Sequence, residues 1–337
     1  MEERLAGINC EKLLKRALRN GGDFAEIYGE AKKGTSIISE ARRVETFLIT
    51  SEFGVGIRVV VGERSAYAYT NDLSTLPDLA DTVASAIKSA EFSRDISLEQ
   101  RPTRCAVSSK INPVDVDSVK KIAMIHAAEE TAWSLDTAVA QVKVIYGDGT
   151  RELLVANSRG FSATDRRESV LFVVQGLVSR DSIMETGYES VGGMRGFELL
   201  EEISPEEIAR RAIGRALKTV KARKAPGGIM PVVLSSEAGG TMIHEAIGHG
   251  LEADLAGEGL SVYSGKIGQK VASASITVVD DGSIQGLRGS MGYDDEGNPR
   301  METVYGGIQV YGEARLSLNA PFPLSAQGPT DSPEETE

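Results

Sequence analysis

The chain has 337 residues, a net charge of −12 and 41% apolar residues. Its length is more than one hydrophobic core usually serves, so two domains are expected and three are possible. The acidic balance argues against a general nucleic-acid binder, which needs a basic face to neutralise phosphates. The apolar runs are too short to span a bilayer, and the N-terminus lacks the pattern of a secretory signal. These features predict a cytoplasmic protein without direct contact with nucleic acid or membrane.

The first ninety residues predict an α+β unit. Apolar residues follow one helical face over 5–19, and Gly21-Gly22 ends that helix. Helical spacing returns over 75–90, with Pro77 in the first turn. Between the two helices, strands are expected over 24–28, 44–50, 55–61 and 65–70.

A polar linker is expected over 93–113, which splits the N-terminal region into two possible subdomains. A helix follows over 117–133, and His126 lies beside its apolar stripe. Gly147-Asp148-Gly149 and Asn157-Ser158-Arg159-Gly160 are typical of turns. Strands are expected around these turns, over 140–146, 152–157 and 170–178.

Ser204-Pro205-Glu206-Glu207 predicts the start of a helix that runs to about residue 220. Ser204 can cap the helix, Pro205 suits its first position, and Glu207 can complete a capping box. The segment 224–228, which contains Pro and Gly, then predicts a boundary, so the first domain should cover residues 1–222.

Beyond this boundary the chain is predicted to be rich in strands. Pro231-Val232-Val233-Leu234 resembles a buried strand, and another strand is expected over 275–279. Turns are expected at Asp280-Asp281-Gly282 and Asp295-Glu296-Gly297, where the acidic residues lack the ligand spacing of a calcium loop. The second domain should cover 223–325, and the polar residues 326–337 should form a disordered tail.

Two of the chain's three histidines lie in His244-Glu245-Ala246-Ile247-Gly248-His249. Zinc is bound by neutral imidazoles and needs a carboxylate base beside its open coordination position. The pattern therefore predicts His244 and His249 as zinc ligands. Glu245 is predicted to be the catalytic base, which takes a proton from metal-bound water and hands it to the leaving amine.

The spacing of the two histidines sets a geometric condition. At i and i+5 they diverge by roughly 140° on a regular α-helix. Both side chains can reach one metal only if the turn is widened, as in a π-bulge, or bent. Gly248, directly before His249, is a plausible place for that distortion.

Other polar residues have more ordinary interpretations. His126 is expected to be a structural histidine rather than a ligand. Glu252 and Asp254 follow the motif and could be a further ligand, carboxylates that orient the ligands, or only a charged helix end.

Several segments make the chain resemble the TldD branch of the TldD/PmbA zinc metallopeptidases. The central match is the run from His244 to Asp254, preceded by Met230–Leu234 and Gly239-Gly240. Supporting matches follow downstream, at residues 276–282, 288–290 and 294–297. The resemblance covers roughly residues 1–304.

The resemblance implies an N-terminal α/β-layered domain followed by a β-rich, barrel-like domain that carries the histidine motif. It implies a cytoplasmic peptidase that acts on unfolded or flexible peptides. TldD-type subunits carry the motif and commonly pair with a PmbA-type partner that lacks it; a homodimer is the other expected assembly. By motif position, His244 and His249 inherit the zinc-ligand role and Glu245 the catalytic role.

The chain departs from the family pattern in one respect that concerns the site. The family supplies its third zinc ligand as a cysteine downstream of the motif. The cysteines of this chain are Cys10 and Cys105, both expected to be buried apolar residues, and neither follows the motif. After about Val304 the sequence leaves the family pattern, which suggests a truncated or altered C-terminus. The site would then have two protein ligands and water, or would use Glu252.

Two functions from different classes follow. The intact His-Glu-His set favours a zinc peptidase subunit. The missing distal cysteine favours a non-catalytic subunit that keeps the fold and acts as a partner or peptide-binding module.

Overall fold

The computed structural model describes residues 2–87, 96–101, 109–272, 278–295, 297–298, 302–305 and 316–318. The chain divides into two compact units, Met1–Arg223 with Gln285–Pro299, and Lys224–Ile284 with Arg300–Glu337. The fold is α+β, as predicted. The domain limits 1–222 and 223–325 stay a prediction. The tail 326–337, Cys105 and much of the predicted linker 93–113 lie outside the described residues.

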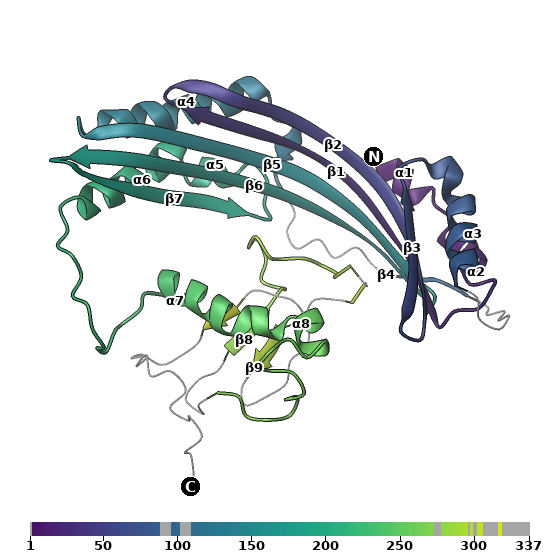
Figure 1. The fold of residues 1–337 in the computed structure, drawn as a ribbon. Coiled ribbons are helices and arrows are strands. Elements are labelled where there is room, and N and C mark those ends of the chain that lie inside the picture. Colours follow the sequence, from purple (N-terminus) through teal and green to yellow (C-terminus); the bar gives the residue numbers. More distant parts are fainter. Residues whose placement is uncertain are drawn as a thin grey trace, which may run out of the picture. The chain divides into compact units, whose positions relative to one another are not determined.

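The first unit is built on a seven-stranded sheet with the order β3-β2-β1-β5-β6-β4, in which β7 also pairs with β6. Its long strands run antiparallel and arch together (Figure 1). Among the described strands, β3 and β4 stand at the two ends of this order, so the sheet is not closed. The bounds are β1 Phe24–Glu40, β2 Arg43–Val61, β3 Arg64–Thr70, β4 Glu99–Arg101, β5 Val139–Asn157, β6 Phe161–Arg180 and β7 Ile183–Gly193.

The strands are longer than the sequence predicts. The turn predicted at Gly147-Asp148-Gly149 is wrong, because this tripeptide lies inside β5 and pairs with Ser36, Thr35 and Gly34 of β1. Neighbouring strands on both sides satisfy its backbone groups, and this pairing overrides the turn preference of glycine. The turn predicted at 157–160 is confirmed, and Gly160 has a φ of 89° there. Strand β7 was not predicted.

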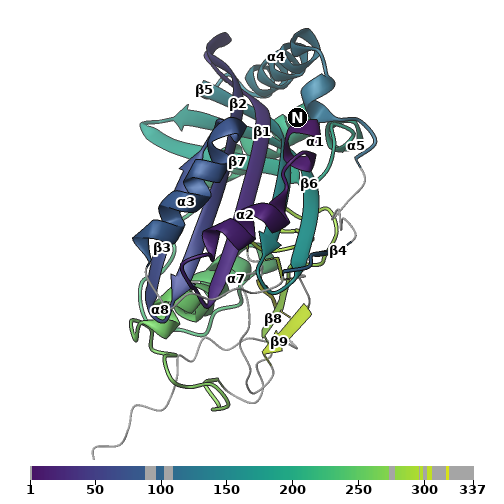
Figure 2. The ribbon, with the colours of Figure 1, turned by 90° about the vertical axis from the view of Figure 1, so that its right-hand side faces the viewer.

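The helices of this unit cover one face of the sheet. Ala25 and Ile27 of β1 belong to one buried cluster with α1, α2 and α3, and Ile37 belongs to a second with α4 and α6. These odd-numbered residues share a face of the strand, so both helix groups lie on that side. Figure 2 shows α2 and α3 in front of the strands. The bounds are α1 Glu2–Ala6, α2 Cys10–Ala17, η1 Leu73–Thr75, α3 Leu76–Ala86, η2 Pro113–Asp115, α4 Ser118–Ser134, α5 Leu199–Glu202 and α6 Pro205–Thr219.

The opposite side of the sheet, with the even-numbered residues of β1 from Lys32 to Ser36, is called the open face below. On the helix side, Cys10 is buried as predicted, and this burial raises the pKa of its thiol to about 11. None of the described helices has the length and apolar character needed to cross a membrane.

The second unit carries the histidine motif and a three-stranded antiparallel sheet of order β10-β8-β9. These described strands do not close into a barrel, so the barrel-like architecture is not seen in the described part of the unit. The bounds are α7 Ser236–Ile243, η3 His244–Gly248, η4 His249–Leu251, α8 Ala253–Gly257, β8 Val278–Asp281, β9 Glu302–Tyr305 and β10 Leu316–Leu318.

The buried strand predicted at residues 231–234 is wrong. This segment has no regular structure and Val233 is 74% exposed. A strand needs a neighbour for its backbone groups, and no described strand pairs with this segment. Of the strand predicted over 275–279, Val278 and Val279 lie in β8, and 275–277 lie outside the described residues.

Candidate metal centre

The three motif residues lie on one helical stretch whose winding changes at the motif. Helix α7 ends at Ile243, and a π-helix follows from His244 to Gly248. The N–H of His249 donates a hydrogen bond to the carbonyl of His244, five residues earlier. This bond widens the turn, so residues five apart meet on one side of the helix. The distortion that the sequence predicts is confirmed.

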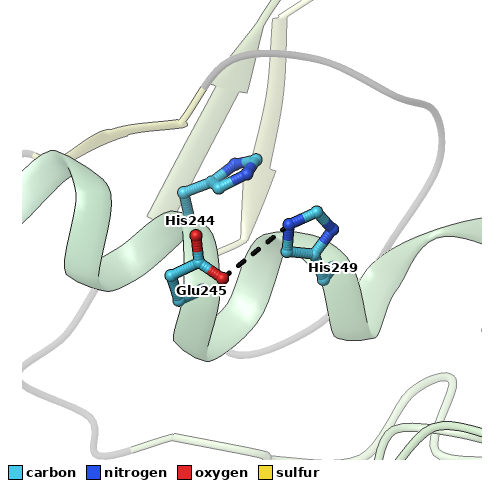
Figure 3. Close-up of side chains that lie close together, drawn as sticks. All are labelled: His244, Glu245 and His249. Atoms are coloured by element: carbon cyan, nitrogen blue, oxygen red, sulfur yellow. Dashed lines mark ion pairs between the residues drawn. The ribbon is translucent and has the colours of Figure 1, made fainter.

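The widened turn brings the two imidazoles together with the carboxylate (Figure 3). The rings of His244 and His249 have centroids 4.4 Å apart at an interplanar angle of 66°. Glu245 Oε2 lies 3.8 Å from His249 Nε2. One candidate ligand atom from each of the three side chains lies within 4.8 Å of the other two, and all three residues are exposed.

Glu252 orients His249. Its Oε1 lies 2.7 Å from His249 Nδ1, and because a carboxylate only accepts, Nδ1 is the donor. The hydrogen bond to Glu252 raises the pKa of His249 above its usual value, against the smaller lowering effect of partial burial. The contact also leaves Nε2 as the free coordinating atom. A carboxylate that holds the far nitrogen of a ligating histidine is the usual outer partner in metal sites.

Two residues that the sequence did not single out support the π turn. The hydroxyl of Tyr263 donates to the carbonyl of Ala246 at 3.1 Å, and Ser261 Oγ donates to the carbonyl of Gly250. A Cβ on Gly250 would lie 2.7 Å from the ring of Tyr263, so the ring needs glycine at this position. No periodic pattern marks Tyr263, because it lies in a loop and acts on backbone carbonyls.

The other polar residues do not join this group. His126 lies on α4 in the first unit, with Nδ1 3.3 Å from Glu129 Oε2. Asp254 accepts from the backbone N–H of its neighbour Leu255 at the start of α8. Among the described residues, only His244, Glu245 and His249 form a set of three that could hold a metal ion.

The acidic turns of the second half are built as predicted. Asp281 accepts from both the backbone N–H and the hydroxyl of Ser283. Asp294 accepts from the backbone and side-chain amides of Asn298, and the N–H of Gly297 donates to its carbonyl. These contacts are those of turns.

The donor set suits a divalent transition metal. Imidazole nitrogens are preferred ligands of zinc, and Glu245 adds a carboxylate beside them. The exposure of the three side chains leaves room for further ligands. The residues present therefore fit a zinc ion held by His244 and His249.

Three family domains match the chain in order. Residues 25–90 match the PmbA/TldA metallopeptidase domain 1, residues 111–220 the central domain, and residues 227–305 the C-terminal domain. The motif lies within the last of these.

Curated relatives agree with this assignment. The metalloprotease TldD homolog of Haemophilus influenzae is 32% identical over 82% of this chain and 59% of its own length. A metalloprotease of Methanothermobacter thermautotrophicus is 32% identical over 84% of this chain and 62% of its own length. The chain thus spans about three fifths of the curated relatives that it matches.

A solved structure shares the fold. The crystal structure of a putative modulator of DNA gyrase from Thermotoga maritima superposes with a TM-score of 0.73 and 19% identity, covering 94% of this chain and 70% of that one. The domain matches and the curated relatives show that the chain belongs to the PmbA/TldD metallopeptidase family, as its sequence predicts.

Proposed function

We propose that this chain is a zinc-dependent metallopeptidase subunit that hydrolyses flexible peptides. His244 and His249 would hold the ion, and Glu245 would be the catalytic base. The observation that carries the proposal is the π turn, which joins two imidazoles and a carboxylate within 4.8 Å of one another. A helix wound this way is unusual and is often found at functional sites.

When bound, the ion would supply Lewis acidity that polarises the scissile carbonyl and acidifies water. Glu245 performs the proton transfers: it takes a proton from the attacking water and gives it to the leaving amine. Its carboxylate is well placed for this role, since it is exposed and lies on the Nε2 side of His249. Glu252 keeps that Nε2 directed toward the site through its contact with Nδ1.

The substrate and the assembly are inferred from the family. The names of the relatives support a peptide as substrate. We infer that a PmbA-type subunit or a second copy of this chain completes the assembly, and that it works in the cytoplasm. Each of these inferences concerns the whole family protein, of which this chain spans a part.

A non-catalytic, peptide-binding subunit is the second candidate. Catalytic zinc sites usually have three protein ligands. Among the described residues, the candidate ligands beside the two histidines are limited to Glu245, the proposed base, and Glu252 already binds His249. This observation favours a subunit that binds peptide or partner without hydrolysis.

Cleavage of an unstructured peptide by the zinc-loaded full chain separates the two candidates. For the peptidase, Glu245→Gln should keep its zinc and lose cleavage by about 10²-fold or more, the usual scale of a lost general base. Glu258→Gln is the matched control, because Glu258 is exposed just beyond α8 and outside the site. Zinc-loaded wild type that cleaves nothing would support the non-catalytic subunit, and a Glu245→Gln chain that cleaves normally would refute the role of Glu245.

A further inference from the structure

A hollow of about 350 Å³ opens on the sheet of the first unit. The residues that line it do not include those of the histidine motif. It lies where four neighbouring strands carry small residues at positions that pair with one another in the strand register. Gly34 of β1 pairs with Thr50 of β2 and with Gly149 of β5, which in turn pairs with Ser169 of β6. At the next level, Ser36 pairs with Gly147. The missing side chains expose backbone and leave the depression on the open face.

Three hydroxyl residues line this hollow, Ser36, Thr50 and Ser169. Within the described residues, none of these hydroxyls forms a hydrogen bond with another protein group. A hydroxyl can donate one hydrogen bond. The hollow thus offers three donors that the fold itself does not use.

Two cations also line it, Lys32 of β1 and Arg288 of the segment 285–299. Neither forms an ion pair with a described residue, although Glu52 stands opposite Lys32 in the strand register. This is notable in a chain with 49 acidic and 37 basic residues. Arg151, which flanks Lys32 on β5, binds Glu30 by contrast.

The position of Arg288 is built into the fold. A Cβ on Gly192 of β7 would lie 3.4 Å from Arg288 Cδ, and one on Gly193 would lie 2.4 Å from the carbonyl of Gly286. The two glycines therefore let the segment that carries Arg288 lie directly on β7. Farther along the same segment, Arg167 of β6 donates to the carbonyl of Tyr293 at 2.7 Å.

We propose that this hollow binds a small oxyanion, a carboxylate or a phosphate, between Lys32 and Arg288. A guanidinium matches the paired oxygens of such a group, and a lysine adds a compact positive charge. The free hydroxyls and the exposed glycine backbone allow the anion to approach closely. The volume lies at the lower end of the range for small-molecule sites. None of the lining residues belongs to the proposed metal centre, and the proposal does not depend on that centre.

Calorimetric titration of the full chain tests the site, in low-salt buffer free of carboxylate and phosphate. The probes are inorganic phosphate, a short acetylated peptide with a free C-terminal carboxylate, and the same peptide with an amidated C-terminus. A His244→Ala background keeps the histidine motif from contributing a metal-bound anion. Binding seen there is independent of the proposed peptidase activity, so the two proposals can fail separately.

Lys32→Gln and Arg288→Gln should each weaken binding of the anionic probe by about tenfold or more, because each removes a charge-assisted contact. Lys33→Gln is the matched control: Lys33 is the next residue, is also exposed, and by strand alternation points to the other side of the sheet. It should leave the affinity unchanged.

The outcomes distinguish the sources of the anion. Binding of phosphate alone assigns a phosphate-bearing ligand, and binding of the free-acid peptide but not its amide assigns a carboxylate. Either result supports the site if Lys32→Gln and Arg288→Gln weaken the binding of that anion. The proposal is overturned if neither anion binds, if the amidated peptide binds as well as the acid, or if Lys33→Gln has the same effect as Lys32→Gln.

Discussion

At the scale of single residues, the contact between Glu252 and His249 leads to the most specific prediction about the site. Glu252→Gln replaces the charged acceptor at Nδ1 and loosens the orientation of the ring. Losing such an outer partner typically lowers metal affinity by about 10–100-fold. We expect that loss for zinc, measured by competition with a chromogenic chelator.

Asp254→Asn provides the comparison for this measurement. Asp254 is close in sequence and exposed, but among the described contacts its side chain bonds only to its neighbour's backbone N–H. Equal zinc affinities for Glu252→Gln and wild type would show that Glu252 does not orient His249. A complete loss of zinc would instead make Glu252 a ligand.

The sequence predicted the motif residues and the widened turn, but not the residues that hold this turn in place. The spacing of His244 and His249 required a widened turn, and the structure has it. Tyr263 and Ser261, which bond to carbonyls in and beside that turn, could not be found this way. Their contacts depend on a loop returning to the helix, and no local pattern encodes that path.

At the scale of elements, a buried ion pair joins α4 to β5. Lys121 Nζ lies 2.6 Å from Asp148 Oδ2, and the two side chains are 1% and 0% exposed. Asp148 also accepts from the N–H of Thr35 and from the hydroxyl of Tyr146. Lys121→Met would leave the carboxylate buried without its cation. We expect a loss of about 3–5 kcal/mol in the free energy of unfolding, measured by urea titration.

Lys120→Met is the control for that loss. Lys120 pairs with Glu201 on the surface at 3.0 Å, and its side chain is half exposed. Exposed pairs contribute about 0–1 kcal/mol. If Lys121→Met and Lys120→Met lowered the free energy of unfolding equally, the buried ion pair would not be what stabilises the packing of α4 on β5.

Glu198, at the start of α5, accepts hydrogen bonds from the backbone N–H groups of Lys110 and Ile111. This contact is expected to be sensitive to acid. Burial raises the pKa of Glu198, but hydrogen bonds from the backbone N–H groups of Lys110, Ile111 and Gly196 outweigh it and leave this pKa below its usual value. A lowered folded-state pKa stabilises the fold above the unfolded-state pKa of about 4.3. That contribution is lost as the pH falls from there through the folded pKa.

Thermal unfolding of Glu198→Gln at several pH values tests this contact. The variant should unfold at a lower temperature than wild type at pH 7, and the difference should shrink as the pH falls below about 4.3. Glu201→Gln, an exposed change on the same helix, should show no such convergence. A difference for Glu198→Gln that stays constant down to low pH would contradict the assignment.

Helix starts were easier to predict than strand lengths. Ser204 caps α6 by accepting from the N–H of Glu207, as predicted, although the Glu207 carboxylate pairs with Arg211 rather than closing the capping box. Caps are local, so a few residues determine them. The long strands are not local. Gly147 and Gly149 lie inside β5 because β1 and β6 pair with it on both sides.

At the scale of the whole molecule, the sequence identified the family but not the path of the chain. Residues 285–299 belong to the first compact unit, although they follow the motif in sequence. This return places Tyr293 against Phe161 and Arg288 in the hollow of the open face. Composition and periodicity cannot predict it, because the segment is held by contacts with residues more than 100 positions away.

The most direct test of the central claim is the zinc content of the purified full chain, by elemental analysis. With three histidines in the sequence, the design is simple. We expect close to one zinc per chain in wild type and in His126→Gln, and essentially none in a variant with both His244→Ala and His249→Ala. Wild type without zinc, or a double variant that retains it, would contradict a metal centre at the π turn.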